Sequence, residues 1–275
     1  MGPGRPQMSR VPLLMLSVLG AVLCACAFPS PRQGAPEPSD RPPLDFYVEQ
    51  VKSTSKLSPA AEIHIVNHWG DIRVRSGDPS GGIVIDAAVQ RIGEPFPARP
   101  ELAVTENSDS FELVVRYPGA SMEPRSGRVD LAVYVPDGLK VSLETLDGKV
   151  EAKKTAVDLK ARTRSGDVLF INQGEADVET ESGEIIARPT APGWATLKLY
   201  SATGRIMAFL PVGPGLEVVA RGTTDIRSHW PLVRDGEHHL LLLGGNHRDR
   251  DQALITSGRS IELLEVVLEP GASEQ

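Results

Sequence analysis

The stretch from Leu139 to about Arg227 repeats one short turn signal, which reads Leu146-Asp147-Gly148, Arg164-Ser165-Gly166-Asp167, Glu181-Ser182-Gly183-Glu184 and Ala202-Thr203-Gly204-Arg205. The four glycines are 18, 17 and 21 residues apart. A near-constant period of this length indicates stacked supersecondary units. Because a Ser-Gly or Asp-Gly pair commonly supplies the residue with positive φ in a tight turn, we expect Gly148, Gly166, Gly183 and Gly204 to be left-handed turn residues.

The segments on both sides of these turns alternate apolar and polar residues, which is the pattern of a strand with one buried face. Before the turns, the inward positions are Leu139/Val141/Leu143, Leu159/Ala161/Thr163, Ala176/Val178/Thr180 and Leu197/Leu199. After the turns they are Val168/Phe170, Ile185/Ala187 and Ile206/Ala208. The pattern predicts an all-β fold, namely a β-solenoid or β-helix-like array of short strands joined by glycine turns.

The repeat fades after Asp225-Ile226 and returns once, where Ile255-Thr256-Ser257-Gly258 is followed by Ile261. We therefore expect Gly258 to be a fifth structural turn. Upstream, Ile63-His64-Ile65 and Ile72-Arg73-Val74 flank Asn67–Asp71 in a hairpin-like pattern. The strands of residues 46–138 are less regularly spaced, so we expect an antiparallel, sandwich-like part before the array. Residues 46–270 should form one β domain, followed by a frayed tail at 271–275.

Residues 1–26 have the features of a targeting segment. Arg5 and Arg10 precede the apolar run Val11–Leu23, which is too short to span a bilayer as a helix. The run ends in Leu23-Cys24-Ala25-Cys26, which resembles the lipobox of bacterial lipoproteins, and the resemblance implies that Cys26 carries the lipid. An ordinary cleaved secretory signal with two incidental cysteines is the alternative. Both cysteines of the chain lie here, so the domain has no disulfide.

Residues 27–45 contain six prolines among serine, glycine and charged residues. Such a composition cannot bury a core and favours an extended polyproline-type tether. Beside a lipidated cysteine, the segment would hold the domain away from a bilayer. Ala27 follows Cys26 where an aspartate would resemble an inner-membrane retention signal, so we expect outer-membrane sorting if the host is Gram-negative.

These residues together resemble the bacterial "putative adhesin" domain family of unknown function. The resemblance covers roughly Glu62 to Leu263 and includes the unit Ile65–Val74 and the step Val135–Gly138. Its main motif is a ladder of Thr-x-Ser-Gly-Asp-Val repeats, here Thr163–Val168, Thr180–Ile185, Ser201–Ile206 and Thr256–Ile261. The resemblance implies a β-solenoid-like fold at the cell envelope, but a fold does not fix a function.

Several polar groups could form a site, and each also has a simpler explanation. His238, His239, His247, Asp249 and Asp251 suggest a metal site, but adjacent histidines on a strand point to opposite faces, so surface polar residues are favoured and no metal is predicted. Arg164/Asp167 and Glu181/Glu184 could form a binding ridge or could be solvated turn residues. Asp147, Asp167 and Glu184 recur at equivalent turns as candidate carboxylates of a polysaccharide-acting site. Repetition explains them without catalysis, so we predict no catalytic residue and no cofactor.

The charge balance argues against nucleic acid. Without Arg5 and Arg10, 27 basic residues face 36 acidic ones, and this excess repels phosphates. The sequence thus predicts a lipid-anchored cell-envelope protein with a non-catalytic interaction or structural module, located in the periplasm or at the surface. Its partners would be the membrane, through the anchor, and an envelope protein or a polysaccharide. The alternatives are a polysaccharide-acting periplasmic or surface enzyme and an envelope-stress sensor or regulator.

Overall fold

The computed structural model describes residues 46–57, 62–79, 82–92, 98–118, 127–190, 196–211, 216–222, 225–231, 233–235, 238–243 and 251–266. Within this part the regular structure consists of strands without helices, arranged in two mixed sheets of 10 and 11 strands. We call the 10-stranded sheet, from β1 to β17, sheet A and the 11-stranded sheet, from β18 to β5, sheet B. The predicted all-β class is confirmed.

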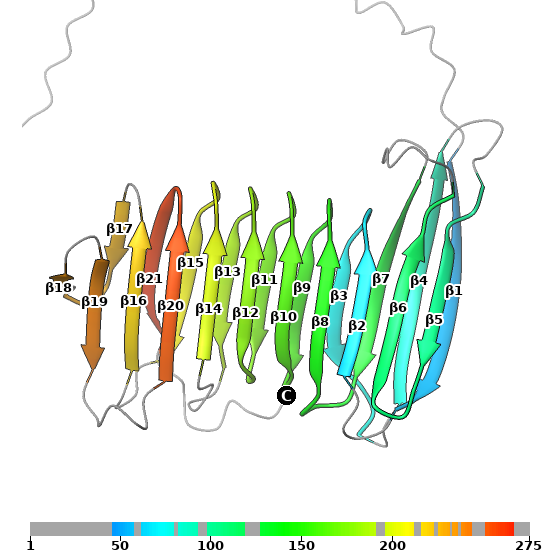
Figure 1. The fold of residues 1–275 in the computed structure, drawn as a ribbon, viewed down its shortest axis with the longest axis horizontal. Helices are drawn as coiled ribbons and strands as arrows, with labels where there is room; N and C mark the ends of the chain where they lie inside the picture. The colour runs from blue at the N-terminus through cyan, green and yellow to red at the C-terminus, as the bar shows by residue number, and fades with distance from the viewer. Residues whose placement is uncertain are drawn as a thin grey trace, which may run out of the picture. The chain divides into compact units, whose positions relative to one another are not determined.

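The repeating unit is a coil, in which one strand of sheet B is followed by one strand of sheet A (Figure 1). The sheet B members are β2 (Glu62–Asn67), β6 (Ser110–Arg116), β8 (Lys140–Thr145), β10 (Asp158–Thr163), β12 (Ala176–Thr180), β14 (Thr196–Ser201), β16 (Leu216–Gly222) and β20 (Asp251–Ser257). Their sheet A partners are β3 (Ile72–Ser76), β7 (Gly127–Val135), β9 (Val150–Thr155), β11 (Val168–Asn172), β13 (Ile185–Pro189), β15 (Ile206–Pro211), β17 (Asp225–Ser228) and β21 (Ser260–Val266). Neighbouring coils pair in parallel, as in a solenoid.

The coils are stacked out of chain order at both ends. In both sheets, β6/β7 lies outside β2/β3, and β20/β21 lies between β14/β15 and β16/β17. Figure 1 shows the orange and red strands of the late β20/β21 coil among yellow neighbours. At the C-terminal end, the β16/β17 coil is thus separated from β14/β15 by a position that the later β20/β21 coil occupies.

The core is made of in-register rows of aliphatic side chains between the two sheets. The most regular row on sheet A runs through Ile72, Val150, Val168, Ile185, Ile206 and Ile261, each at most 1% exposed. β-branched side chains pack well on a pleated surface, and stacking them coil on coil extends one core along the array.

The N-terminal part differs from the prediction in one respect. The expected hairpin of Ile63–Ile65 with Ile72–Val74 is wrong, because β2 and β3 lie in different sheets and form a coil. Antiparallel pairing is confirmed for β1 (Phe46–Lys56), β4 (Gly82–Ile92) and β7, and for β5 (Glu101–Glu106) with β6. At the other end, β19 (His238–Leu243) pairs antiparallel with β16, and the short β18 (Val233–Asp235) pairs antiparallel with β19.

The predicted left-handed turn glycines are a second correction. Gly148, Gly166, Gly183 and Gly204 lie in the bends between the two strands of a coil, but their φ is not positive. Among the described residues only Gly70, Gly138 and Lys154 have positive φ. Glycine is needed because a Cβ on each would overlap the carbonyl oxygen of the glycine one coil before, as Gly166 would with Gly148. Close approach of the coils, not backbone conformation, selects glycine here.

The last coil is also out of the predicted register. Ser257, not Thr256, pairs with Ser201, so the alignment of Thr256 with Thr163 is wrong by one residue. A Cβ on Gly258 would meet the carbonyl oxygen of Ala202 rather than that of Gly204. Gly258 is thus a closely packed bend residue that does not continue the glycine stack.

Candidate functional site

The bends of the stacked coils form an edge, here called the turn edge, along Gly148, Gly166, Gly183 and Gly204. Buried hydroxyls hold this edge together from inside. Thr180 Oγ1 accepts the N–H of Gly183 at 3.0 Å and donates to the carbonyl of Gly166, in the preceding coil, at 3.3 Å. Ser201 repeats both contacts at 2.9 Å, to Gly204 and Gly183. These hydroxyls satisfy buried amides and carbonyls, so they stabilise the stack rather than face a ligand.

The carboxylates predicted along this edge are engaged by the next coil. Asp167 Oδ1 accepts the backbone N–H of Glu184 at 2.8 Å. Glu184 Oε1 accepts two hydrogen bonds from the Arg205 guanidinium, at 2.6 and 2.9 Å. This carboxylate raises the pKa of Arg205. Asp147 is exposed on its own bend. The three carboxylates therefore succeed one another along the stack, and two of them bind groups of the protein itself.

A groove of about 500 Å³ lies at the end of the turn edge nearest the last coils. It is lined by four carboxylates and three arginines, together with serine, glycine and isoleucine: Asp167, Ser182, Glu184, Gly204, Arg205, Asp225, Arg227, Arg259, Ser260, Ile261 and Glu262. Arg205 also reaches Glu262 at 3.7 Å, and Arg227 Nε lies 2.7 Å from Asp225. Acidic and basic side chains are intermixed, so the groove suits a polar, uncharged or zwitterionic group better than an ion.

Of the four ridge residues, Asp167 and Glu184 line this groove, whereas Arg164 and Glu181 are exposed on neighbouring bends. Arg164 and Glu181 take part in the edge through their carbonyls, which accept hydrogen bonds from Ser182 and Thr203. The proposed ridge is therefore a real edge of the molecule, with half of its side chains used to join coils.

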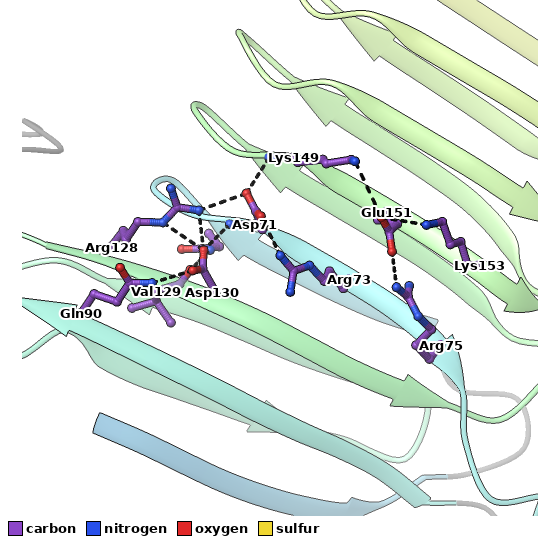
Figure 2. Close-up of polar contacts among 11 residues, drawn as sticks. Asp71, Arg73, Arg75, Gln90, Arg128, Val129, Asp130, Lys149, Glu151 and Lys153 are labelled. Carbon is purple, nitrogen blue, oxygen red and sulfur yellow. Dashed lines mark hydrogen bonds and ion pairs between the residues drawn. The ribbon is translucent and has the colours of Figure 1, made fainter. Parts of the chain in front are cut away.

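A polar network that the sequence analysis did not predict joins the N-terminal strands to the array (Figure 2). Asp71, at the start of β3, accepts hydrogen bonds from Arg73, Arg128 and the backbone N–H of Lys149 at 3.0–3.1 Å. Asp130 on β7 accepts the backbone N–H of Asp71 at 2.9 Å and the Gln90 amide at 2.6 Å. Arg128 bridges the two carboxylates; burial alone would lower its pKa, but Asp130 and Asp71 outweigh that effect and raise it.

Glu151 on β9 is the centre of a second part of this network. Its residue is only 8% exposed, and its carboxylate contacts Arg75, Lys153 and Lys149. Burial would raise the pKa of Glu151, but hydrogen bonds from Arg75 and Lys153 more than offset it, so the pKa lies below its usual value. Ionised carboxylates held by cations cannot serve as general acids near neutral pH. The network joins β7, β3 and β9, and we call it the clamp.

Sheet B carries a second hollow of about 640 Å³ on its outer face. Its lining includes Lys140, Lys160 and Lys198 together with Asp158, Glu175 and Asp177. The alternation of charges across neighbouring strands makes this face hydrophilic along several coils.

Other predicted site residues lie outside what the structure describes. Cys26, the tether, His247 and Asp249 fall in undescribed segments, and the side chains of His238, His239 and Asp251 are not described. Among the described residues, no group of three or more potential ligands could hold a metal ion. The same part of the chain contains no helix that is long and apolar enough to cross a membrane.

The clamp could not be found from sequence, because Asp71 and Arg128 are 57 residues apart and neither has a motif of its own. The hydroxyl ladder did leave a signal. A threonine or serine stands three residues before Gly166, Gly183 and Gly204, as the last residue of the sheet B strand, and its hydroxyl accepts the N–H of that glycine. Thr145 stands at the same place before Gly148, but its hydroxyl has no hydrogen-bond partner among the described residues.

The chain is similar to known proteins in its three-dimensional structure and not in its sequence. No protein-family model and no curated protein matches the chain. The fold is similar to a crystal structure of a "putative cell adhesion protein" from Clostridium sporogenes, with 10% identity, a TM-score of 0.46, and 79% of this chain and 99% of that chain covered. It is also similar to a "putative adhesin" from Bacteroides fragilis, with 12% identity, a TM-score of 0.33, and 79% and 97% covered. A "putative adhesin" from Parabacteroides merdae has 11% identity, a TM-score of 0.30, and 78% and 96% covered.

Proposed function

We propose that this chain is a lipid-anchored cell-envelope protein whose β-solenoid-like domain is a non-catalytic, adhesin-like interaction or structural module. One observation carries the non-catalytic part of the proposal. The carboxylates best placed for catalysis, Asp167 and Glu184, bind the backbone or the arginine of the next coil. The stacked coils themselves offer broad sheet faces for binding.

The anchoring part rests on the lipobox-like Leu23–Cys26 and on the proline-rich segment that follows it. Metabolic labelling of cells with a palmitate analogue tests it directly. Cys26→Ser should abolish labelling and leave an unprocessed precursor, because the modified cysteine becomes the new N-terminus. Cys24→Ser is the matched control and should label normally. Labelling of Cys26→Ser at the native level would rule out the anchor.

A polysaccharide-acting enzyme is the competing function, since the groove at the turn edge contains four carboxylates. Incubating the protein with purified envelope polysaccharides and measuring new reducing ends separates the two functions. We expect no release above the rate of a Glu184→Gln, Glu262→Gln double variant. Release that depends on these two carboxylates would replace the binding module by an enzyme.

A further inference from the structure

The outer faces of the two sheets differ in chemistry over the three coils β10/β11, β12/β13 and β14/β15. On sheet A, Leu169 on β11, Ile186 on β13 and Met207 on β15 are paired in register and point away from the core. Ile171, Phe209 and Leu264 lie two residues further along their strands and also face outward. We call these six side chains the apolar island: Leu169, Ile171, Ile186, Met207, Phe209 and Leu264.

The island is not required by the core. All six side chains are half-buried, and none belongs to the core cluster. On the opposite face, the in-register outward row is charged over β10, β12 and β14, with Lys160, Asp177 and Lys198, and continues into the exposed Leu254 on β20. These six side chains are contiguous, and together with the exposed Arg188 on β13 they form the surface of sheet A on which the inference is built.

Charges surround the island in a defined way. Glu151 and Glu262 end its first row on either side, and both are held by basic side chains of this chain, Arg75 and Arg205 among them. Arg188, in register with Ile171 in the second row, is exposed. It makes no hydrogen bond or ion pair with any described residue. The island thus carries one uncompensated positive charge among aliphatic side chains.

A second copy of the chain fits this surface poorly. If two copies packed face to face about a two-fold axis parallel to β13, their Arg188 side chains would lie against each other. Glu151 of one copy would lie against Glu262 of the other. An axis along the stack would lay Arg188 over an isoleucine and leave it unpaired, which is costly once water is excluded. The island spans four strands about 4.8 Å apart and two rows about 7 Å apart. That area is well below the roughly 800 Å² per partner of a standard interface.

We infer that the apolar island with Arg188 binds a short segment of another protein, one that presents aliphatic or aromatic side chains on both sides of a carboxylate. The apolar side chains would cover the island, and the carboxylate would pair with the guanidinium of Arg188, as a charge-assisted and partly desolvated contact. The inference rests on the proposed interaction module and names its binding face and the chemistry of its partner.

A random peptide library displayed on phage is the probe. The bait is residues 27–275, which contain the compact unit Pro43–Gln275. Peptides with Asp or Glu flanked by apolar residues should be enriched on the native bait and not on Ile186→Lys. A synthetic peptide of the enriched sequence should bind Arg188→Glu and Ile186→Lys about tenfold more weakly or worse. Leu254→Lys and Lys198→Glu, exposed positions on sheet B, are the matched controls and should bind as the native protein does.

Each other outcome overturns the inference. Peptides that bind Ile186→Lys as well as the native bait place the surface elsewhere, as does loss of binding in the sheet B controls. Enrichment of basic or uncharged peptides contradicts the role of Arg188. A native dimer in sedimentation that Ile186→Lys dissociates assigns the island to a second copy. As a control for folding, each variant should unfold thermally at the native midpoint.

Because palmitate labelling does not involve sheet A, failure of the anchor and failure of this inference are distinguishable.

Discussion

Ser201 Oγ donates a hydrogen bond of 2.9 Å to the carbonyl oxygen of Gly183, one coil away. The same relationship joins Thr180 to Gly166 and Ser257 to Gly204, so a single file of buried hydroxyls links the backbone of successive bends. This file explains why the motif needs threonine or serine as well as glycine. The glycine brings two coils into contact, and the hydroxyl satisfies the polar backbone groups that this contact buries.

Thr180→Val should therefore lower the free energy of unfolding by about 1–3 kcal/mol. Valine keeps the shape but leaves the buried N–H of Gly183 without an acceptor. Thr145→Val is the matched control, because the buried Thr145 hydroxyl has no hydrogen-bond partner among the described residues. It should be neutral or stabilising. Denaturant unfolding measures both, and equal midpoints for the two variants would contradict the role of the ladder.

The glycine stack gives a second comparison. Gly166→Ala forces a Cβ into the carbonyl of Gly148, and backbone atoms cannot move aside as a side chain can. We expect a loss near the upper end of overpacking costs, about 3 kcal/mol. Gly138 has a φ of +83°, and no atom lies within 4 Å of the position that a Cβ would occupy there. Gly138→Ala should therefore cost only its conformational strain, about 1–2 kcal/mol.

Both variants can be compared by urea unfolding. If Gly138→Ala is the more damaging of the two, positive φ matters more in this fold than the close approach of coils. Adding Gly183→Ala to Gly166→Ala should give a non-additive loss, because the two glycines belong to adjacent coils in direct contact.

The sequence predicted the array because its two signals are local. Glycine spacing and period-2 alternation each reflect a single coil, so residues such as Gly166, Val168 and Phe170 were assigned to the correct places. The predicted reason for the glycines, a positive φ, was wrong. Glycine is selected both where φ is positive and where there is no room for a Cβ atom, and the sequence does not distinguish the two cases. Only the neighbouring coil distinguishes them.

The order of the coils could not be predicted for a related reason. The segment around Ser257-Gly258 has the same local sequence pattern as the other repeats. That pattern does not indicate that β20 lies between β14 and β16 instead of on the outer side of β16. The clamp of Asp71, Arg128 and Asp130 depends on that kind of long-range placement too. The apolar island was present in the sequence as Leu169, Ile186 and Met207. These residues alternate with core residues that are equally apolar, so periodicity alone did not set them apart.

Stability should depend on pH through Glu151. Its pKa is lowered in the folded protein by Arg75 and Lys153, so the ionised carboxylate stabilises the fold. This contribution is complete above the unfolded pKa of about 4.5 and is lost as the pH falls through the lower folded value. Glu151→Gln should thus be less stable than the native protein at pH 7, by about 1–3 kcal/mol. The difference should shrink below pH 4.5. A difference that stays constant from pH 7 to pH 3 would show that Glu151 acts through packing rather than charge.

The late coil provides a test of the stacking order. β16 pairs with β20 and β19, and β17 pairs with β21, so neither strand of the β16/β17 coil touches β14 or β15 in register. Deleting residues 233–275 removes every strand that pairs with this coil. It also leaves β14 and β15 without β20 and β21, their hydrogen-bonded neighbours on that side. We expect the amides of Val218 and Ala220 to lose their protection from hydrogen exchange, while those of Val168 and Val178 keep it, because solenoid coils rest mainly on their neighbours. The control is deletion of the undescribed residues 267–275 alone, which should leave both groups protected. If Val218 and Ala220 stay protected after the larger deletion, β16 can pair directly with β14, and the position that β20 occupies is not a fixed feature of the fold.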